Sequence, residues 1–448
     1  MKIQIVAVLL FLQPLVEAQD VLDEYIKTGL AGNLALQQKE AQYQKSIEAL
    51  NEARALFYPD LSFNARYTVS EGGRVINLPV GDMLNPVYNT LNALTASHNF
   101  PNIENQQINF LRPHEHETKI RLVQPLFNTE IYYNSRIRKE MTGYQSADME
   151  QYKRELVAEI KKAYYNLSMA DGVLNMLNGT RKLLTENIRV NQKLFENDKI
   201  TKDVLLRSQA ELGKFDQQMQ EAQKQDIVAI SYFNFLLNRP LGDSVIIKQP
   251  LSFPRLMDLT GDLTGNALKN REELRKLEEY NKIAGLNLKM SQSGRFPDLF
   301  VAVDYGFQGE TYEFNRDAEY AQASAILRWN LFRGFENRAK IREAKIEKDI
   351  ADSRLEEARK QIELQVVSSL NELKTAEKGI VSAETTLSNA REGFRLTEKR
   401  YSQGQASLLE FLDSRTTLTQ AEENLIISKF RYLSSFAELE KVIAVNKY

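Results

Sequence analysis

One phrase occurs twice in this chain, and the repetition limits the possible folds more than any other feature. Tyr58–Leu61 reads YPDL, and Phe296–Leu299 reads FPDL. Further along, Lys119–Phe127 (KIRLVQPLF) is matched by Ser324–Phe332 (SAILRWNLF), and each copy then enters a very long stretch with helical spacing. The sequence therefore predicts an internal duplication, in which one supersecondary plan of about 200 residues is used twice.

Each copy has the same predicted order of elements: helix, strand, connection, strand, very long helix and closing helix. The predicted helices cover 21–56, 131–197 and 202–237 in the first copy and 263–291, 336–402 and 407–443 in the second. The long helices carry apolar residues at steps of three and four, and many of these residues are alanine. This spacing favours close, coiled-coil-like packing, and a helix of about 67 residues would be about 100 Å long.

Four short segments alternate apolar and polar side chains and are predicted to be strands. They cover 61–70, 118–127, 299–308 and 322–332, and in the second of them Gln124 interrupts the apolar face. About ten alternating residues suit a tilted strand that crosses a bilayer, but they suit a small soluble sheet equally well. Four strands cannot close a barrel. If these strands lie in a membrane, several copies of the chain must therefore share a single barrel, and three copies would supply twelve strands.

Composition and the first residues narrow the class of protein. Lys2, the apolar run Ile3–Leu12 and the small residue Ala18 predict a secretory signal peptide over 1–18, with a short N-terminal helix as the alternative. The sequence contains no later run of about 18 apolar residues, so no transmembrane helix is predicted. The net charge of −2 gives no reason to expect a nucleic-acid partner, and the absence of cysteine excludes disulfides, thiolate zinc sites and a cysteine nucleophile.

Taken together, these features resemble the TolC-type outer-membrane efflux and secretion proteins over nearly everything after the predicted signal peptide. The resemblance is carried by the duplication, the two Pro-Asp-Leu strand starts, the WNLF stretch at 329–332 with Gly334, Arg400-Tyr401 with Gly404, and LLEFLDS at 408–414. It implies a homotrimer with a shared twelve-stranded outer-membrane barrel in lipid and a twelve-helix periplasmic α-barrel tunnel. It also implies a periplasmic adaptor and an inner-membrane pump of RND or ABC type as partners.

The predicted fold class is therefore mainly α with a β-barrel part. The predicted domains are the signal peptide 1–18, a first repeat 19–237 with a long surface loop 71–117, a connecting segment 238–262 and a second repeat 263–448. The connecting segment is either a small mixed region or a plain linker. The predicted function is passive conduction of substrates from a pump and adaptor to the cell exterior, in efflux or type I secretion, without enzymatic activity or a cofactor. The alternative is an exported trimeric coiled-coil protein with a structural or adhesive role.

Two acidic residues near the turn between the last two helices are candidate gate residues. Glu410 and Asp413 match the paired acidic positions that ring the narrow periplasmic entrance in the resembling family. Their spacing of three places both on one helical face. In a trimer they would give six carboxylates around one axis and a constriction that favours cations. The alternative is a pair of solvated acids on an ordinary helix.

The same resemblance supplies candidates for a latch that holds the entrance closed. Tyr401 matches a latch tyrosine, and Asp203 matches an acidic partner in the first copy. Ala406 occupies the place where the family has an arginine, so the charged latch is not expected to be intact. Lys199 or Lys202 is a possible substitute.

The long insert between the first two strands contains the only candidate metal motif. His114-Glu115-His116-Glu117 has donors that metals use, but a polar loop sequence explains it better, and no metal site is predicted. Asn85-Pro86 and Pro101 predict an irregular surface loop. We expect this loop either to constrict the channel mouth or to contact external partners.

Overall fold

The computed structural model describes residues 17–247, 253–255 and 261–445. The predicted signal peptide lies almost entirely outside the described residues, and the connecting segment lies partly outside them. The described chain forms two compact units, and each unit takes segments from both predicted repeats. The second unit contains Ala49–Arg138 and Leu286–Lys345, and the first contains the rest.

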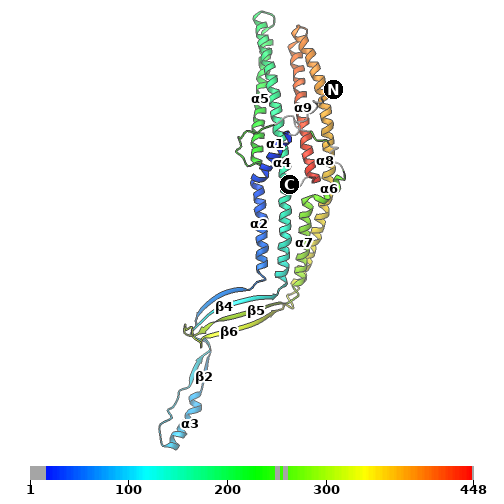
Figure 1. The fold of residues 1–448 in the computed structure, drawn as a ribbon. Coiled ribbons are helices and arrows are strands. Elements are labelled where there is room, and N and C mark those ends of the chain that lie inside the picture. The colour runs from blue at the N-terminus through cyan, green and yellow to red at the C-terminus, as the bar shows by residue number, and fades with distance from the viewer. Residues whose placement is uncertain (1–16, 248–252, 256–260, 446–448) are drawn as a thin grey trace, which may run out of the picture. The chain divides into compact units, whose positions relative to one another are not determined.

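Helices are the main secondary structure, and the two repeats contain corresponding sets of them (Figure 1). The set of the first repeat is α1 (Glu17–Gly32), α2 (Leu34–Ala55), α4 (Thr129–Glu196) and α5 (Lys202–Leu236). The set of the second repeat is α6 (Leu263–Asn270), α7 (Glu272–Ser293), α8 (Glu336–Ser402) and α9 (Leu408–Ile443). Across the part of the chain that the structure describes, none of the helices is both long enough and apolar enough to span a membrane.

The leading helix of each repeat is broken, so the single helices predicted there are wrong. Asn33 separates α1 from α2, where its side-chain amide donates to the Leu236 carbonyl at 2.9 Å and its Oδ1 accepts from the Leu36 backbone N–H at 3.0 Å. Arg271 separates α6 from α7, and its Nη1 donates to Gln365 at 2.5 Å. Asn33 Oδ1 thereby satisfies a backbone N–H at the start of α2 that a continuous helix would satisfy internally. Periodicity misses such breaks because some of these bonds reach distant parts of the chain.

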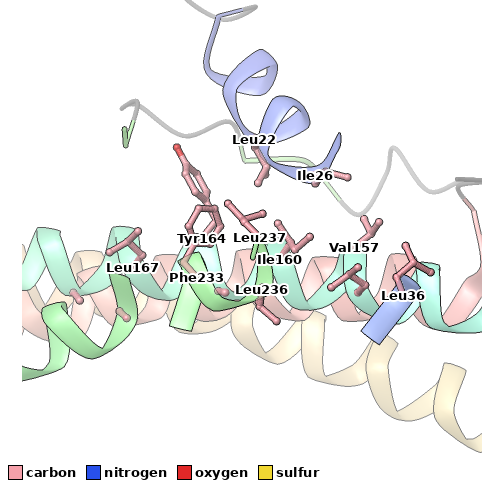
Figure 2. Packing of buried hydrophobic residues seen from close by; sticks show 14 residues of the cluster. Leu22, Ile26, Leu36, Val157, Ile160, Tyr164, Leu167, Phe233, Leu236 and Leu237 are labelled. Carbon is pink, nitrogen blue, oxygen red and sulfur yellow. The ribbon is translucent and has the colours of Figure 1, made fainter. Parts of the chain in front are cut away.

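Each repeat builds its own hydrophobic core within the first unit. The first core joins α1, α2, α4 and α5, and Tyr164 and Phe233 are fully buried in it (Figure 2). The ring of Tyr25 meets that of Phe233 edge-on at 5.1 Å. The second core joins α6, α7, α8 and α9 around Leu373 and Leu439, which are also fully buried. Corresponding helices thus form corresponding cores, as an internal duplication requires.

Ion pairs connect the two repeats inside the first unit. Arg154 of α4 binds Glu272 of α7 through two parallel hydrogen bonds of 2.8 and 2.7 Å. Asp148 accepts from Lys39 at 2.7 Å and from Lys276 at 3.0 Å. Burial alone would raise the pKa of Asp148, but the two lysines outweigh it and hold that pKa below its usual value. The Arg154–Glu272 and Lys276–Asp148 pairs join one repeat to the other, whereas the Lys39–Asp148 pair lies within the first repeat.

The second unit contains a four-stranded antiparallel sheet with the order β1-β4-β5-β6 (Figure 1). Its strands are β1 (Asp60–Val69), β4 (His114–Phe127), β5 (Asp298–Gly309) and β6 (Glu319–Arg328). The pairing of β4 with β5 joins the two repeats, and β1 and β6 form the outer edges. On one face Arg121 binds Asp304 at 2.7 and 2.6 Å. The opposite face exposes apolar side chains such as Phe63, which is 71% exposed.

The strand bounds differ from the predicted ones in β4 and β6. β4 begins at His114, four residues before the predicted start, because it pairs with β1 as far as Val69. β6 ends at Arg328, so the predicted strand residues 329–332 lie outside it. Gln124 interrupts the apolar face for a tertiary reason: its amide donates to the Phe57 carbonyl at 3.0 Å, next to a shift in the β4–β5 register.

The insert between β1 and β4 is ordered, so the irregular loop predicted for it is wrong. It contains β2 (Val75–Leu78), α3 (Val80–Thr95) and β3 (Gln106–Asn109), and β2 pairs antiparallel with β3. Asn85 exchanges two hydrogen bonds with the backbone of Ile103, at 2.9 and 2.8 Å, and Asn92 exchanges two with Phe100, at 2.8 and 3.1 Å. These tertiary bonds stabilise a helix that contains Pro86, a residue that locally favours a turn.

Candidate gate at the helical turns

Two tight turns, α4 to α5 and α8 to α9, position the predicted gate residues. Gly404 lies in the turn after α8 with a φ of +73°, which suits glycine, and the Gln405 N–H donates to the Arg400 carbonyl at 2.8 Å. In the first repeat Asp198 takes the corresponding left-handed conformation, with a φ of +53°. Both turns lie in the first unit.

Glu410 takes part in the start of α9. Ser407 caps this helix and accepts from the Glu410 N–H at 3.2 Å, while the Glu410 carboxylate reaches back to the Ser407 N–H at 3.5 Å. This reciprocal arrangement is a capping box. Arg400 of α8 also lies 3.4 Å from the Glu410 carboxylate, and both side chains are about half exposed. Asp413, one turn further on, is exposed, so the two predicted gate acids have different surroundings.

Tyr401 is hydrogen-bonded, but to a different residue from the one predicted. Its hydroxyl donates to Asn191 Oδ1 at 3.0 Å, and its ring stacks on Phe411 with a centroid distance of 4.7 Å. The amide of Asn191, which is fully buried, donates to Ser208 Oγ at 2.8 Å. We call this connection of α8, α4 and α5 through Tyr401, Asn191 and Ser208 the polar latch. Asp203, the predicted partner, lies exposed in the first turn of α5.

A buried arginine lies two residues beyond Asp413. Arg415 is 7% exposed, and its guanidinium carbon lies 5.4 Å from the centroid of the Phe215 ring on α5. Its Nη1 donates to Thr419 at 3.5 Å, and its Nε has no hydrogen-bond partner among the described residues. Burial lowers the pKa of Arg415, and the charge of Glu211 opposes that effect only in part. Arg415 therefore links α9 to α5 by a cation–π contact.

A groove of about 750 Å³ lies beside the polar latch. Its lining is mostly apolar and includes Val190, Leu194, Ile200 and Phe411. Ala406, which replaces the arginine expected from the family pattern, also lines this groove. Ala406 thus contributes an apolar side chain at the place of the expected arginine, and the hydrogen bonds of Tyr401, Asn191 and Ser208 beside it are between neutral groups.

The two histidines of the candidate metal motif lie in the second unit, on the apolar face of the sheet. His116 is fully buried and its ring stacks on Tyr312 at 4.3 Å. Nδ1 of His114 lies 3.2 Å from the Tyr67 hydroxyl. Within the described ranges, no group of three or more histidine, cysteine, aspartate and glutamate side chains could hold a metal ion. Both histidines thus belong to an aromatic cluster.

Comparisons with known proteins agree with this architecture. The family described as Outer membrane efflux protein matches residues 263–445, the second repeat. The chain is 24% identical over 332 residues to the alkaline protease secretion protein AprF of Pseudomonas aeruginosa, covering 71% of this chain and 67% of AprF. It is 19% identical over 446 residues to the outer membrane protein TolC of Escherichia coli, covering 93% of this chain and 80% of TolC. The second repeat thus matches the Outer membrane efflux protein family, and the chain resembles TolC-type outer-membrane efflux and secretion channels over most of its length.

The fold of this chain is also found in solved structures. The outer-membrane channel OprN superposes with a TM-score of 0.78 at 16% identity, covering 97% of this chain and 93% of OprN. At this identity the likeness shows the fold alone. The matches to efflux proteins of Pseudomonas putida span 61% of the length of those proteins. The activity and substrates of these relatives are therefore assigned to this chain only as a proposal.

Similarity to these outer-membrane efflux and secretion proteins places the channel in the outer membrane, extending into the periplasm. Channels of this type work with inner-membrane pumps and periplasmic adaptors.

Sequence reasoning missed three residues at the turns of this channel: Asn191, Ser208 and Arg415. A signal for Asn191 was present, because it follows the buried Leu177 and Leu184 at intervals of seven residues. A polar residue on such an apolar seam indicates a buried hydrogen bond.

Proposed function

We propose that this chain forms one third of a closed channel. β1 of each copy pairs with β6 of the next, so that three four-stranded sheets make one twelve-stranded barrel. The observation that carries the proposal is the sheet itself, which has an exposed apolar face, an ion-paired polar face and two outer edges. In hydrocarbon an unpaired edge leaves costly backbone groups, and ring closure removes both edges. The apolar face then contacts lipid and the polar face lines the lumen.

The helical turns supply the gate in this proposal. Twelve long helices from three copies form a periplasmic tunnel, and the turns surround its narrow end. The polar latch keeps each copy in the arrangement described above. Glu410 and Asp413 contribute six carboxylates to the entrance, which favours cations. Arg400 reduces the net charge near Glu410, so the exposed Asp413 carries the larger share of this selectivity.

The partners follow from the proposed channel. A periplasmic adaptor and an inner-membrane pump of RND or ABC type dock at the turns and open the gate, and substrate passes through without chemical change. AprF is named for alkaline protease secretion, whereas other relatives are named for antibiotic or toluene efflux. The proposed cargo of this channel therefore belongs to one of these two classes, exported proteins or small molecules.

The test is the state of the protein in the outer membrane. We expect detergent-extracted protein, kept unheated, to migrate as a trimer and to form conducting channels in planar lipid bilayers. Recovery of a soluble periplasmic monomer would refute the barrel and the tunnel together. A stable trimer without conductance would instead support the exported coiled-coil alternative.

A further inference from the structure

The helix α3 of the insert packs on its own chain through its polar side. The residues of this side are Gly81, Asn85, Tyr88 and Asn92. Asn85 and Asn92 bond the returning backbone as described above, and the Tyr88 ring lies 5.8 Å from that of Phe100. A side chain at Gly81 would come within 2.4 Å of the Ile103 carbonyl oxygen, so this side of the helix lies directly against the returning segment.

The opposite side of α3 is apolar and exposed. We call it the outer stripe, and it consists of Met83, Val87, Thr90 and Leu94. Met83 is 70% exposed, Val87 52% and Leu94 78%. Steps of four, three and four keep these side chains in one line on a helix, which is the pattern of a seam between helices. A helix that turns its apolar seam away from its own chain is suited to an external partner.

We propose that the outer stripe packs against the outer stripes of two other copies of this chain, so that three α3 helices meet across the outer mouth of the channel. This inference rests on the proposed trimer. The insert occurs once per chain and is bounded by the adjacent strands β1 and β4, so a trimer brings three inserts to one rim. A threefold axis makes each contact identical, which a seam of the same helix can satisfy.

The size of the outer stripe favours another copy over a separate protein. From Met83 to Leu94 the helix rises about 17 Å, so with a helix width of about 10 Å the stripe covers roughly 170 Å². A stable complex of separate proteins buries about 800 Å² on each partner, several times more. A copy that is already held nearby by the barrel needs far less contact, because its effective concentration is high.

The charge of α3 disfavours an anionic lipid surface as the partner. Helices that lie on such surfaces carry lysine or arginine on their polar side, and α3 has neither. Asp82 is its only charged residue, lies off the stripe and accepts from Asn105 at 2.9 Å.

The chain has no cysteine, so any disulfide formed by a single-cysteine variant must join the introduced cysteines of two copies. Val87→Cys and Leu94→Cys place a thiol on the outer stripe, and Asn89→Cys places one on an exposed position of α3 away from it. We expect mild oxidation of the assembled protein to produce disulfide-linked dimers with the two stripe variants and only background with Asn89→Cys. Because each trimer holds three thiols, at most two of every three chains can be linked. The double variant Val87→Glu and Leu94→Glu should raise channel conductance while the trimer persists.

Two readouts separate the possible failures. If unheated samples contain no trimer, the proposed function fails. If the trimer is present but the stripe variants link no better than Asn89→Cys, the stripe contact is refuted and the proposed channel stands. Protection of the stripe thiols from maleimide only in lipid vesicles, without cross-links, would assign the outer stripe to the membrane surface and would equally refute the contact.

Discussion

Replacement of Tyr401 by phenylalanine is the most direct test of the polar latch. The substitution removes one hydroxyl, which donates to Asn191 Oδ1 at 3.0 Å. The phenylalanine ring can keep the stacking on Phe411, whose ring centroid lies 4.7 Å away. Asn191 is fully buried, and no other donor among the described residues reaches its Oδ1. The change therefore leaves one buried acceptor without a partner and alters little else.

The expected magnitude follows from that lost bond. A buried acceptor left unpaired costs about 1–3 kcal/mol. A change of about 1.4 kcal/mol alters an equilibrium constant about tenfold. If the polar latch holds the gate closed, Tyr401→Phe should shift the equilibrium of each copy toward the unlatched state by a factor of about 5 to about 140.

Single-channel recording in planar lipid bilayers measures this shift. We expect wild-type channels to remain mainly in a low-conductance state and Tyr401→Phe channels to spend much more time in a high-conductance state. Tyr232→Phe is the matched control, because its hydroxyl lies on the exposed side of α5 with a long 3.5 Å contact to Glu159. Conductance of an intact Tyr401→Phe trimer that equals that of wild type and control would refute the latch.

Three further predictions test the gate, the helix break and the ion pairs. Glu410→Ala with Asp413→Ala should weaken block by trivalent cations, and unchanged block in conductance recordings would exclude these acids as the constriction. Asn33→Leu removes two buried hydrogen bonds and should lower the free energy of unfolding by about 1–3 kcal/mol, measured by denaturant titration. Burial opposes ionisation of Glu438, yet the hydrogen bond from Lys162 holds the pKa of this carboxyl below the usual 4.5. The ionised carboxylate therefore stabilises the folded state above pH 4.5, and this stabilisation should be lost as the pH falls below 4.5. Melting temperatures should therefore depend less on acid pH in Glu438→Gln than in wild type.

The sequence predicted the regular elements well because their signals are local. Helix α8 runs over Glu336–Ser402, the range that apolar steps of three and four predict. The alternation in β1 and β5 also predicted which side chains share a face, since successive residues of a strand point to opposite sides. The duplication appears again in two cores built from corresponding helices.

The sequence predicted the insert poorly because its order depends on contacts between its own distant parts. The Asn85-Pro86 pair favours a turn locally, but in the structure Asn85 bonds to the backbone of Ile103 and the helix continues. The hairpin of β2 and β3 is short, and its exposed residues give no clear alternation of buried and solvated faces.

By itself, then, the sequence determined the duplication, the periods of its helices and strands, and the position of the turns, because each is a property of neighbouring residues. Only the tertiary structure decided the helix breaks and the partner of Tyr401. That partner is Asn191, which is 210 residues away along the chain, rather than the predicted Asp203. The family resemblance implies an acidic partner, but burial beside Phe411 favours a neutral acceptor that is itself hydrogen-bonded, because an uncompensated charge there would be costly.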